Sequence, residues 1–364
     1  MTALRYCADF DAARDRLTHW WRGGDLGRPA LQLTVRRETP ADDIAPRARP
    51  AGWVTDYSTS DFDYRVYLAL RSCVDLDYVA EAVPAVSPCL GPNTLALYLG
   101  CGAREMPGTV WFQPCIAAPE AAVFDPAPDG FYWDFTLRLL AAQLRLGGDR
   151  FLTSFPDLIE GLDTLAAMRG TEALLVDLLE RPDWVHASLT QITQRYFEYY
   201  DRLYELQRDE RGGSHFWAWA PGRMAKLQCD FSAMISPAMF GEFMVPVLEE
   251  MTGRLDYCMY HWDGPGAVGH LDALLSVAGI DMIQWTPGAG AAAVTDRQWW
   301  PLYHRIVAAG KKVILLGLDT STGGMDGVAR LKQEFGNRLQ QFMFGMRCAS
   351  LGQAEKVIDM TEVA

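Results

Sequence analysis

The stretch YCMYHWDGPG, residues 257–266, changes character along its length. It begins as an apolar and aromatic run, presents His261 and Asp263 two positions apart, and then reaches a Gly-Pro-Gly sequence. Such a run is typical of a buried strand, and Gly-Pro-Gly is typical of the turn that follows a strand. A helical pattern, AVGHLDALLSV, comes next at 267–277. The stretch therefore predicts a strand, turn and helix unit with polar side chains at the end of its strand.

The same unit recurs through the second half of the chain. Apolar runs occur at 224–229, 257–261, 281–285, 312–318 and 341–346, and helical patterns such as RQWWPLYHRIVAAG and DGVARLKQEF separate them. Near-continuous apolar strands about 25 to 30 residues apart indicate a parallel sheet covered on both faces. Shorter runs at 28–35, near residue 80 and at 150–155 bring the total close to eight. We therefore expect an α/β fold, a (β/α)8 TIM barrel, with an open doubly wound sheet as the alternative.

The N-terminal third is less regular than the rest. We expect residues 1–364 to form a single barrel domain, in which 1–130 is an irregular N-terminal part that includes the first strands, and 131–364 holds the regular βα units. A hairpin is expected around 110–112. After Pro182, apolar residues recur every three to four positions, which predicts a long amphipathic helix.

Composition excludes some classes of partner. The formal net charge is −13 and the isoelectric point is near 4.9, so bulk attraction to nucleic acid or to an anionic membrane is not expected. The N-terminus carries acids among its apolar residues and resembles neither a signal peptide nor a membrane span, which predicts a cytoplasmic protein. The 8 cysteines show no CxxC pair and are expected to be mostly buried thiols in a reducing compartment.

Polar residues finish most of the predicted strands. In a parallel barrel these ends meet at one face, where the chemistry of the fold is located. The residues concerned are Asp157, Asp230, His261, Asp263, Gln284, Asp319, Arg347 and Cys348.

A metal site is the sharpest hypothesis for this face. His261 and Asp263 flank one residue, so an extended backbone places their side chains on the same side, and Cys348 would add a sulfur donor from a later strand. Nitrogen, oxygen and sulfur donors suit Zn²⁺. The alternative is that His261 and Asp263 form a hydrogen-bonded pair that organises the turn, with Cys348 a buried hydrophobe. The Gly-Pro-Gly turn itself is better explained as a helix entry than as a phosphate site.

Further residues are candidates for substrate binding. Aromatic side chains cluster near the predicted strand ends, where they would suit a flat or cationic ligand, although each alone could belong to the core. Arg223 could clamp a carboxylate or phosphate, or serve as a structural ion-pair partner. Asp230 is expected in the pocket, whereas Cys229 is expected to be buried. The aromatic candidates are Trp217, Trp219, Tyr260, Trp262 and Trp285.

The chain resembles the uroporphyrinogen decarboxylase superfamily, which includes zinc-dependent corrinoid methyltransferases. The resemblance lies in RGTEALLVDLLERPDWV (169–185), CDFSAMISPAMFGEFMVPVLEEM (229–251), the stretch from 261 to 290 and the closing ASLGQAEKVI (349–358). It implies a (β/α)8 barrel. The Arg-rich stretch that true decarboxylases carry after the first strand is absent, because the chain reads LQLTVRRETP there, and this disfavours porphyrinogen decarboxylation.

The methyltransferase branch binds zinc through a His-x-Cys and a later Cys. His261 matches the His, Asp263 stands where the first Cys would be, Cys348 falls at the last position, and Gln284 stands near a Glu found in related enzymes. The resemblance therefore implies a zinc-dependent methyltransferase that moves a methyl group between a small substrate and a thiol, or a corrinoid carried by a partner protein. Asp263 and Asp230 are the expected catalytic carboxylates.

Two other functions are left open. One is a metal-free decarboxylase-type enzyme that acts on a small carboxylate, with Arg223 as its anchor and Asp230 or Asp263 as the polar partner. The other is a non-catalytic binding barrel, which the Asp at the usual Cys position would suit. A homodimer is compatible with the sequence under each of these functions.

Overall fold

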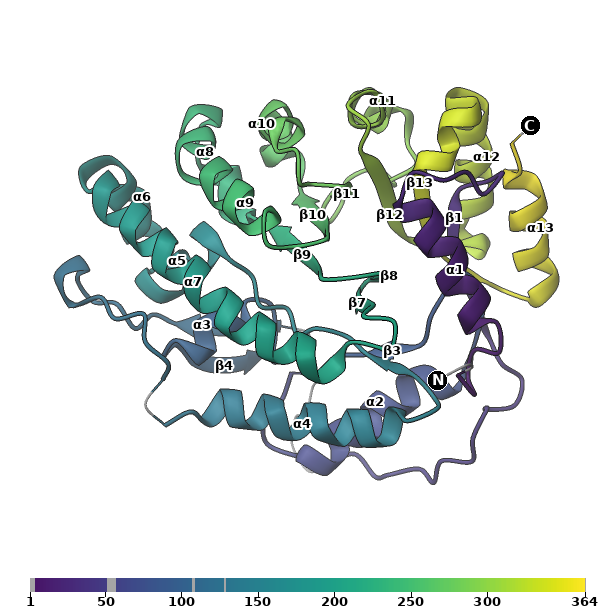
Figure 1. Cartoon of the computed structure of the whole chain (residues 1–364), viewed down its shortest axis with the longest axis horizontal. Coiled ribbons are helices and arrows are strands. Elements are labelled where there is room, and N and C mark those ends of the chain that lie inside the picture. The colour runs from purple at the N-terminus through teal and green to yellow at the C-terminus, as the bar shows by residue number, and fades with distance from the viewer. Residues whose placement is uncertain (1–3, 51–56, 107–108, 128, 364) are drawn as a thin grey trace.

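The chain is built around one sheet that is almost entirely parallel. The computed structural model describes residues 4–50, 57–106, 109–127 and 129–363 (Figure 1). A seven-stranded sheet has the order β2-β1-β13-β12-β11-β10-β9, in which β2 alone is antiparallel to its neighbour. Its strands are β1 (Ala30–Arg36), β2 (Leu76–Ala80), β9 (Met224–Gln228), β10 (Tyr257–Asp263), β11 (Met282–Thr286), β12 (Lys312–Asp319) and β13 (Phe342–Cys348).

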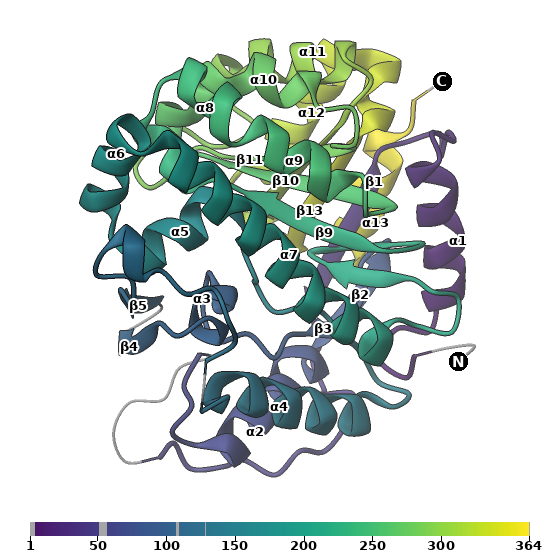
Figure 2. The same cartoon turned by 60° about the vertical axis from the view of Figure 1, so that its left-hand side comes forward.

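Helices follow the parallel strands as the sequence predicts, because a parallel neighbour requires a crossover connection. They lie along the outer side of the sheet (Figures 1 and 2). The apolar stretch FGEFMVPVLEEM, residues 240–251, is divided between two helices, with Pro246 at the start of the second. The helices are α8 (Pro237–Phe243), α9 (Val245–Thr252), α10 (Leu271–Ser276), α11 (Trp300–Ala308), α12 (Gly324–Phe335) and α13 (Leu351–Thr361).

The strand order bears on the two predicted architectures. From β9 to β13 and then β1, each strand lies beside the next one in a single direction, without the reversal that defines a doubly wound sheet. Two further short strands, β3 (Ala85–Val86) and β6 (Leu152–Thr153), pair with each other in parallel but belong to a separate sheet. The chain thus has an α/β fold with a parallel sheet, and hydrogen bonds do not close the described strands into a ring.

The N-terminal part is more helical than the expected strands and loops. It contains α1 (Phe10–Trp21), α2 (Phe62–Val74) and α3 (Thr94–Tyr98), and α4 (Phe131–Gly147) follows it. In α1 the buried positions include Phe10, Ala13, Leu17, Trp20 and Trp21, a helical spacing that the charged residues between them obscured. The predicted hairpin is present as β4 (Gly102–Met106) and β5 (Thr109–Gln113).

The long predicted helix is also present, as α7 (Pro182–Gln207), and its apolar stripe is buried against the core. Before it lie α5 (Gly161–Arg169) and α6 (Thr171–Glu180), and after it the short hairpin β7 (Ser214–Phe216) and β8 (Ala218–Ala220). This hairpin is important because it carries two of the predicted aromatic residues toward the strand ends.

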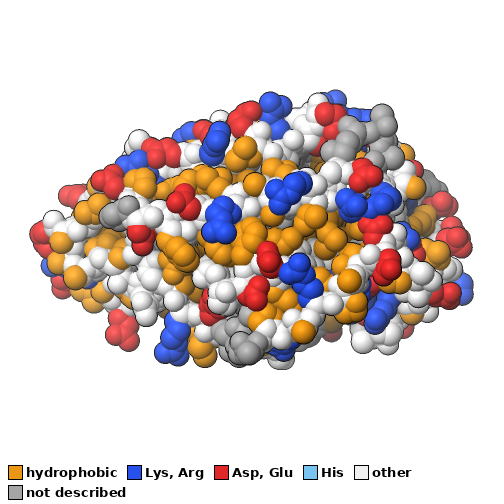
Figure 3. Space-filling view, turned by 90° about the horizontal axis from the view of Figure 1, so that it is seen from below, with side chains coloured by type: hydrophobic (Ala, Val, Ile, Leu, Met, Phe, Trp, Pro, Cys, Tyr) orange, Lys and Arg blue, Asp and Glu red, His pale blue; other side chains and the backbone are white. Residues whose placement is uncertain are grey.

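Charges on the surface are mixed in sign. Figure 3 shows the face seen from below, where apolar side chains form a band and basic and acidic side chains are interspersed around it. No extended basic area is present on this face, in keeping with the net charge of −13. Among the described residues no helix combines the length and the apolar character needed to cross a bilayer.

One buried carboxylate ties the N-terminal helix to the sheet. Glu81 follows β2, is fully buried, and accepts hydrogen bonds from Arg16 at 2.7 Å, from Arg28 at 2.8 Å and from the backbone N–H of Leu31 at 2.7 Å. Burial acts to raise the pKa of Glu81, but Arg28, Leu31 and Arg16 together hold it below its ordinary value.

We predict that Glu81→Ala lowers the free energy of unfolding by about 3 to 5 kcal/mol, because two guanidinium groups lose a buried partner. Since the folded-state pKa of Glu81 is lowered, its contribution is present above the pKa of an unfolded glutamate and is lost as the pH falls through the folded value. Urea denaturation at several pH values measures both effects. Glu38→Ala, at an exposed position, is the control and should change stability by no more than about 0.5 kcal/mol. Equal effects of the two substitutions would contradict the prediction.

Candidate functional site

Three potential ligand side chains meet at the carboxyl ends of β9 and β10. Asp230, His261 and Asp263 each offer one ligand atom, and these atoms lie within 4.8 Å of one another. Alternation along β10 explains the pairing of His261 with Asp263, because positions two apart face the same side of a strand. Asp230 comes from the neighbouring strand end. The structure therefore brings together three of the residues that the sequence singled out.

Cys348 is not in this group. Its neighbour Arg347 lines a cavity on the inner side of the sheet, so Cys348 faces the opposite side, in register with the buried Val35. In the sheet order, β12 and β11 also separate its strand from β10. The expected approach of the Cys348 thiol to His261 is therefore not observed, and Asp230 is the third side chain that lies beside His261 and Asp263. Cys229 is likewise buried and outside the group.

His261 is held in a defined orientation. Its Nδ1 lies within hydrogen-bonding distance of Oε1 of Gln284, and the Gln284 amide nitrogen donates to Oγ1 of Thr286 at 2.8 Å. Because the amide nitrogen is engaged elsewhere, the oxygen faces the ring, so Nδ1 carries the proton and Nε2 keeps its lone pair. Burial, followed by the charge of Lys226, lowers the pKa of His261 below its ordinary value. The ring is therefore neutral at pH 7, the form that binds metals.

Asp230 is positioned by a second carboxylate. Asp163, at the start of α5, accepts hydrogen bonds from the backbone N–H groups of Asp230 and Phe231, both at 2.8 Å. These bonds fix the single helical turn that begins at Asp230. Burial and the charge of Asp230 raise the pKa of Asp163 to about 6. Burial, followed by the charge of Asp263, also raises the pKa of Asp230.

Acidic groups accumulate around this point, and one lysine lies among them. Lys226, on β9, has a fully buried side chain whose Nζ is 2.6 Å from Oδ1 of Asp157 and close to Oε1 of Gln228. Glu160 is also fully buried, and burial raises its pKa well above the ordinary value. Oδ1 of Asp263 is buried without a hydrogen-bond partner among the described residues. An unpaired carboxylate oxygen beside other carboxylates favours a bound cation.

Sequence reasoning missed Lys226, Glu160 and Asp163. A signal existed for Lys226, because a lysine within the apolar run MAKLQC is unusual for a fully buried strand. Glu160 and Asp163 sit at the start of a helix, where acidic residues are common, so their sequence positions do not indicate a site.

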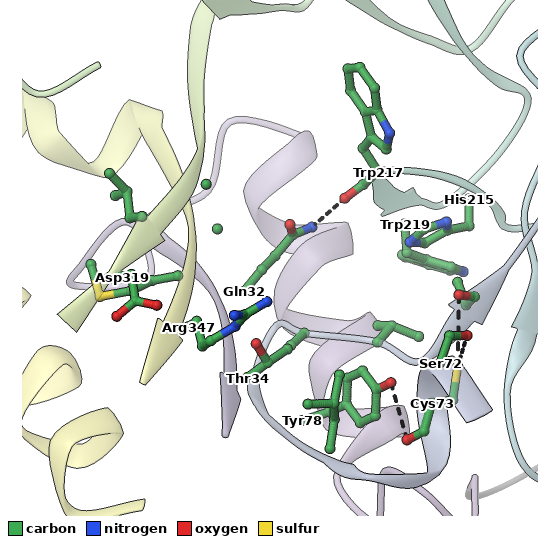
Figure 4. Close-up of a pocket in the computed structure, with 18 residues that line it drawn as sticks. Gln32, Thr34, Ser72, Cys73, Tyr78, His215, Trp217, Trp219, Asp319 and Arg347 are labelled. Carbon is green, nitrogen blue, oxygen red and sulfur yellow. Dashed lines mark hydrogen bonds between the residues drawn. The ribbon is translucent and has the colours of Figure 1, made fainter. Parts of the chain in front are cut away.

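The predicted aromatic residues divide into two sets. Trp217 and Trp219, from the β7–β8 hairpin, line the cavity beside the strand ends (Figure 4). Tyr260, Trp262 and Trp285 are instead buried on the helix side of the sheet. The indole N–H of Trp262 donates to the carbonyl of Ala267, and the ring of Trp285 lies 5.0 Å from that of Trp299. The placement of these three is that of core side chains, because alternation turns them away from the inner face.

Trp217 is in ring contact with His261 of the ligand group. Its ring centroid is 5.4 Å from that of His261, edge to face, and its exposed fraction is 38%. Its backbone φ is +55°, a conformation that costs about 1 to 3 kcal/mol for a bulky residue. The carbonyl of Trp217 accepts a hydrogen bond from Gln32 at 2.9 Å. Such strain is typical of positions that a site holds in place.

Arg223 lies at the other end of the sheet. It immediately precedes β9, pairs with Asp201 of α7, and has its guanidinium 5.0 Å from the ring centroid of Tyr200. Burial acts to lower the pKa of Arg223, but Asp201 raises it overall. The position is that of a structural ion-pair partner, so the expected role of Arg223 as a substrate anchor at the strand ends is not supported.

Comparison with known proteins gives a fold likeness. No family model matches the chain, and no curated protein matches its sequence. Among solved structures, a methyltransferase from Methanosarcina mazei is similar, with a TM-score of 0.56 and 13% sequence identity, over 96% of this chain and 98% of that one. At this identity the likeness concerns the fold, which it supports over nearly the whole length.

The orientation of His261 leads to a prediction. Nitrogen-resolved NMR of the metal-free protein should show the neutral tautomer with the proton on Nδ1, titrating below the ordinary histidine value of 6.5. Gln284→Met should lower the pKa of His261 further, because the hydrogen bond to Gln284 favours the charged ring. Gln191→Met, at an exposed position of α7, is the control. A proton on Nε2 in the unmodified protein would contradict the assignment.

Proposed function

We propose that this protein is a metal-dependent methyltransferase whose metal is bound by Asp230, His261 and Asp263. The observation that supports it most is the group of three ligand atoms within 4.8 Å at the carboxyl ends of parallel strands. The fold likeness to a methyltransferase over nearly the whole chain agrees with this function. We further propose that the strands form an open variant of the (β/α)8 barrel of the uroporphyrinogen decarboxylase superfamily, with the site at its catalytic face.

The residues present fit a divalent metal ion. One neutral imidazole and two carboxylates would make a three-ligand set that leaves a position free, and the unpaired Oδ1 of Asp263 has no other partner among the described residues. Without a sulfur ligand the set is harder than a thiolate site, so Mn²⁺, Fe²⁺ and Co²⁺ suit it as well as Zn²⁺. Zn²⁺ remains the first ion to test.

When bound, the ion would lower the pKa of a coordinated thiol or polarise a leaving group. The chain's own residues prepare the site for this. Gln284 keeps the Nε2 lone pair of His261 toward the group, Asp163 holds Asp230 in place, and Trp217 shields one side from water. Lys226 neutralises part of the negative charge near the ligands through its ion pair with Asp157. The methyl group would move between a small substrate in the adjoining cavity and a thiol, or a corrinoid on a partner protein.

A metal-free enzyme is the second candidate, and Lys226 favours it. Its ammonium group already supplies a cation within the acidic cluster, and the raised pKa of Asp163, about 6, places that carboxyl in a useful range for acid–base chemistry. This candidate needs no ion and predicts full activity after chelation. A binding barrel without catalysis predicts ligand-induced stabilisation without turnover.

The metal proposal predicts that the protein, purified with zinc and then dialysed, retains bound Zn²⁺. Inductively coupled plasma mass spectrometry measures the metal content. His261→Ala and Asp263→Ala should lose the ion, and Gln284→Met should weaken affinity by about 10- to 100-fold, as loss of a partner behind a ligand does. Cys348→Ser should keep the ion. Methyl transfer from methylated amines or thiols to a thiol or to Co(I) cobalamin should stop on chelation and return with metal.

The control variants make the outcome decisive. Cys229→Ser, another buried thiol outside the group, should bind metal as the unmodified protein does. If the Cys348→Ser variant lost the metal, this would instead support the sequence-based hypothesis that the Cys348 thiol is a metal ligand. An unmodified protein that binds none of the four ions would remove the metal proposal and leave the metal-free candidate.

A further inference from the structure

A cavity of about 550 Å³ is lined in part by Trp217, whose ring contacts that of His261. Its walls come from α2, β1, β2, the segment 82–85, β12, β13 and the β7–β8 hairpin (Figure 4). The Trp217 indole therefore lies between the wall of this cavity and the ligand group. The size of the cavity is that of a small-molecule site.

The only charged side chains among the described residues that line this cavity are Arg347 and Asp319. They are opposite each other in the register of β13 and β12. Oδ1 of Asp319 accepts hydrogen bonds from the backbone N–H and the hydroxyl of Ser321, at 2.7 and 2.5 Å, and these bonds lower the pKa of Asp319. Asp319 is therefore ionised and engaged in its own turn.

Arg347 has no hydrogen bond and no ion pair with any described residue. The charge of Arg347 contributes to lowering the pKa of Asp319, but the two side chains are not within ion-pair distance of each other. In Figure 4 the guanidinium lies between Thr34 and Gln32, which extend from β1. Thr34 is in register with Arg347 on the paired strand, so its hydroxyl is available on the same side. An unpaired guanidinium beside a hydroxyl is suited to a planar carboxylate.

The backbone leaves room for a ligand at this place. Gly345 precedes Arg347 by two positions and is in register with Gln32, so it faces the cavity without a side chain. The space beside its Cα is filled, because a Cβ at Gly345 would come within 2.6 Å of Leu316 Cδ2, so this glycine reflects close packing. Gly317, at the irregularity of β12, has a φ of +75° and open space in front of it. The room for a ligand therefore lies in front of Gly317, where a packed barrel interior would present a bulky residue.

We propose that this cavity binds the carboxylate of a small substrate, with Arg347 as its anchor and Thr34 as a second donor. The rest of the molecule would extend along Trp217 toward His261. Asp319 offsets one unit of positive charge, which favours a monoanionic carboxylate over a phosphate dianion. Calling this ligand the substrate rests on the proposed function, whereas the binding itself does not.

The test compares acids with their uncharged amides on the whole protein. Calorimetry should detect benzoate or butanoate binding, whereas benzamide and butanamide should bind much more weakly. Arg347→Met should weaken binding of the acids by about 10- to 100-fold, the loss expected for a charged hydrogen-bonding partner, and Arg347→Lys should recover part of it. Asp319→Asn keeps the acceptor for Ser321 but removes a negative charge, so it should tighten binding about two- to fivefold.

Arg202→Met is the matched control, because this arginine is exposed on α7 and lies outside the cavity. It should leave acid binding unchanged. Amides that bind as well as acids, an Arg347→Met variant that binds acids normally, or no binding of either acid up to about 10 mM would each overturn the proposal.

Measurements on chelated protein separate this inference from the proposed function. Acid binding that depends on Arg347 should persist after chelation. Arg347 lies on β13, whereas the proposed metal ligands lie at the ends of β9 and β10. A protein that binds acids but never a metal would refute the metal proposal alone. A protein that binds metal but shows no difference between acids and amides would refute the carboxylate site alone.

Discussion

The parallel register of β9, β10 and β11 is the constraint on which the site depends. His261 is paired with Gln228 on one side and with Gln284 on the other, so three polar side chains form one row across the inner face. A shift of one residue would turn this row toward the helices and bring Tyr260 or Trp262 inward. The buried tryptophans on the helix side oppose that shift, because an indole facing the polar group would leave a void behind it. Core packing therefore fixes which residues can meet.

The electrostatics of the site follow from crowding rather than from any single pair. Several carboxyl groups lie near one another with one ammonium group, and burial opposes their ionisation. A second cation in this place would relieve the repulsion that remains. Asp163 takes part in this crowding in two ways. It accepts hydrogen bonds from the backbone turn at Asp230 and Phe231, and the charge of Asp230 raises its pKa. Such coupling makes the site sensitive to its surroundings, and it is typical of functional positions.

A fold alone does not determine the reaction. The similar methyltransferase shares 13% of its residues with this chain, so its activity is a guide to the class of experiment rather than a description of this protein. The group of Asp230, His261 and Asp263 offers nitrogen and oxygen atoms and no sulfur, and the fold does not dictate this choice. The cavity beside Trp217 is a second feature that the fold does not dictate, because Arg347 there has no partner among the described residues and Asp319 is engaged in its own turn. Both features arise from side chains at strand ends, where this architecture tolerates variation.

The sequence by itself determined the strands and helices of the second half, the parallel sheet, and the convergence of His261 with Asp263. These follow from local periodicity and from the alternation of one strand, which need no knowledge of distant residues. Only the tertiary structure decided that Asp230, and not Cys348, lies beside His261 and Asp263. It also decided that Arg223 lies at the opposite end and that Trp262 and Trp285 belong to the core. The reason is physical: which side of a strand faces inward depends on register with its neighbours, and no single segment encodes that register.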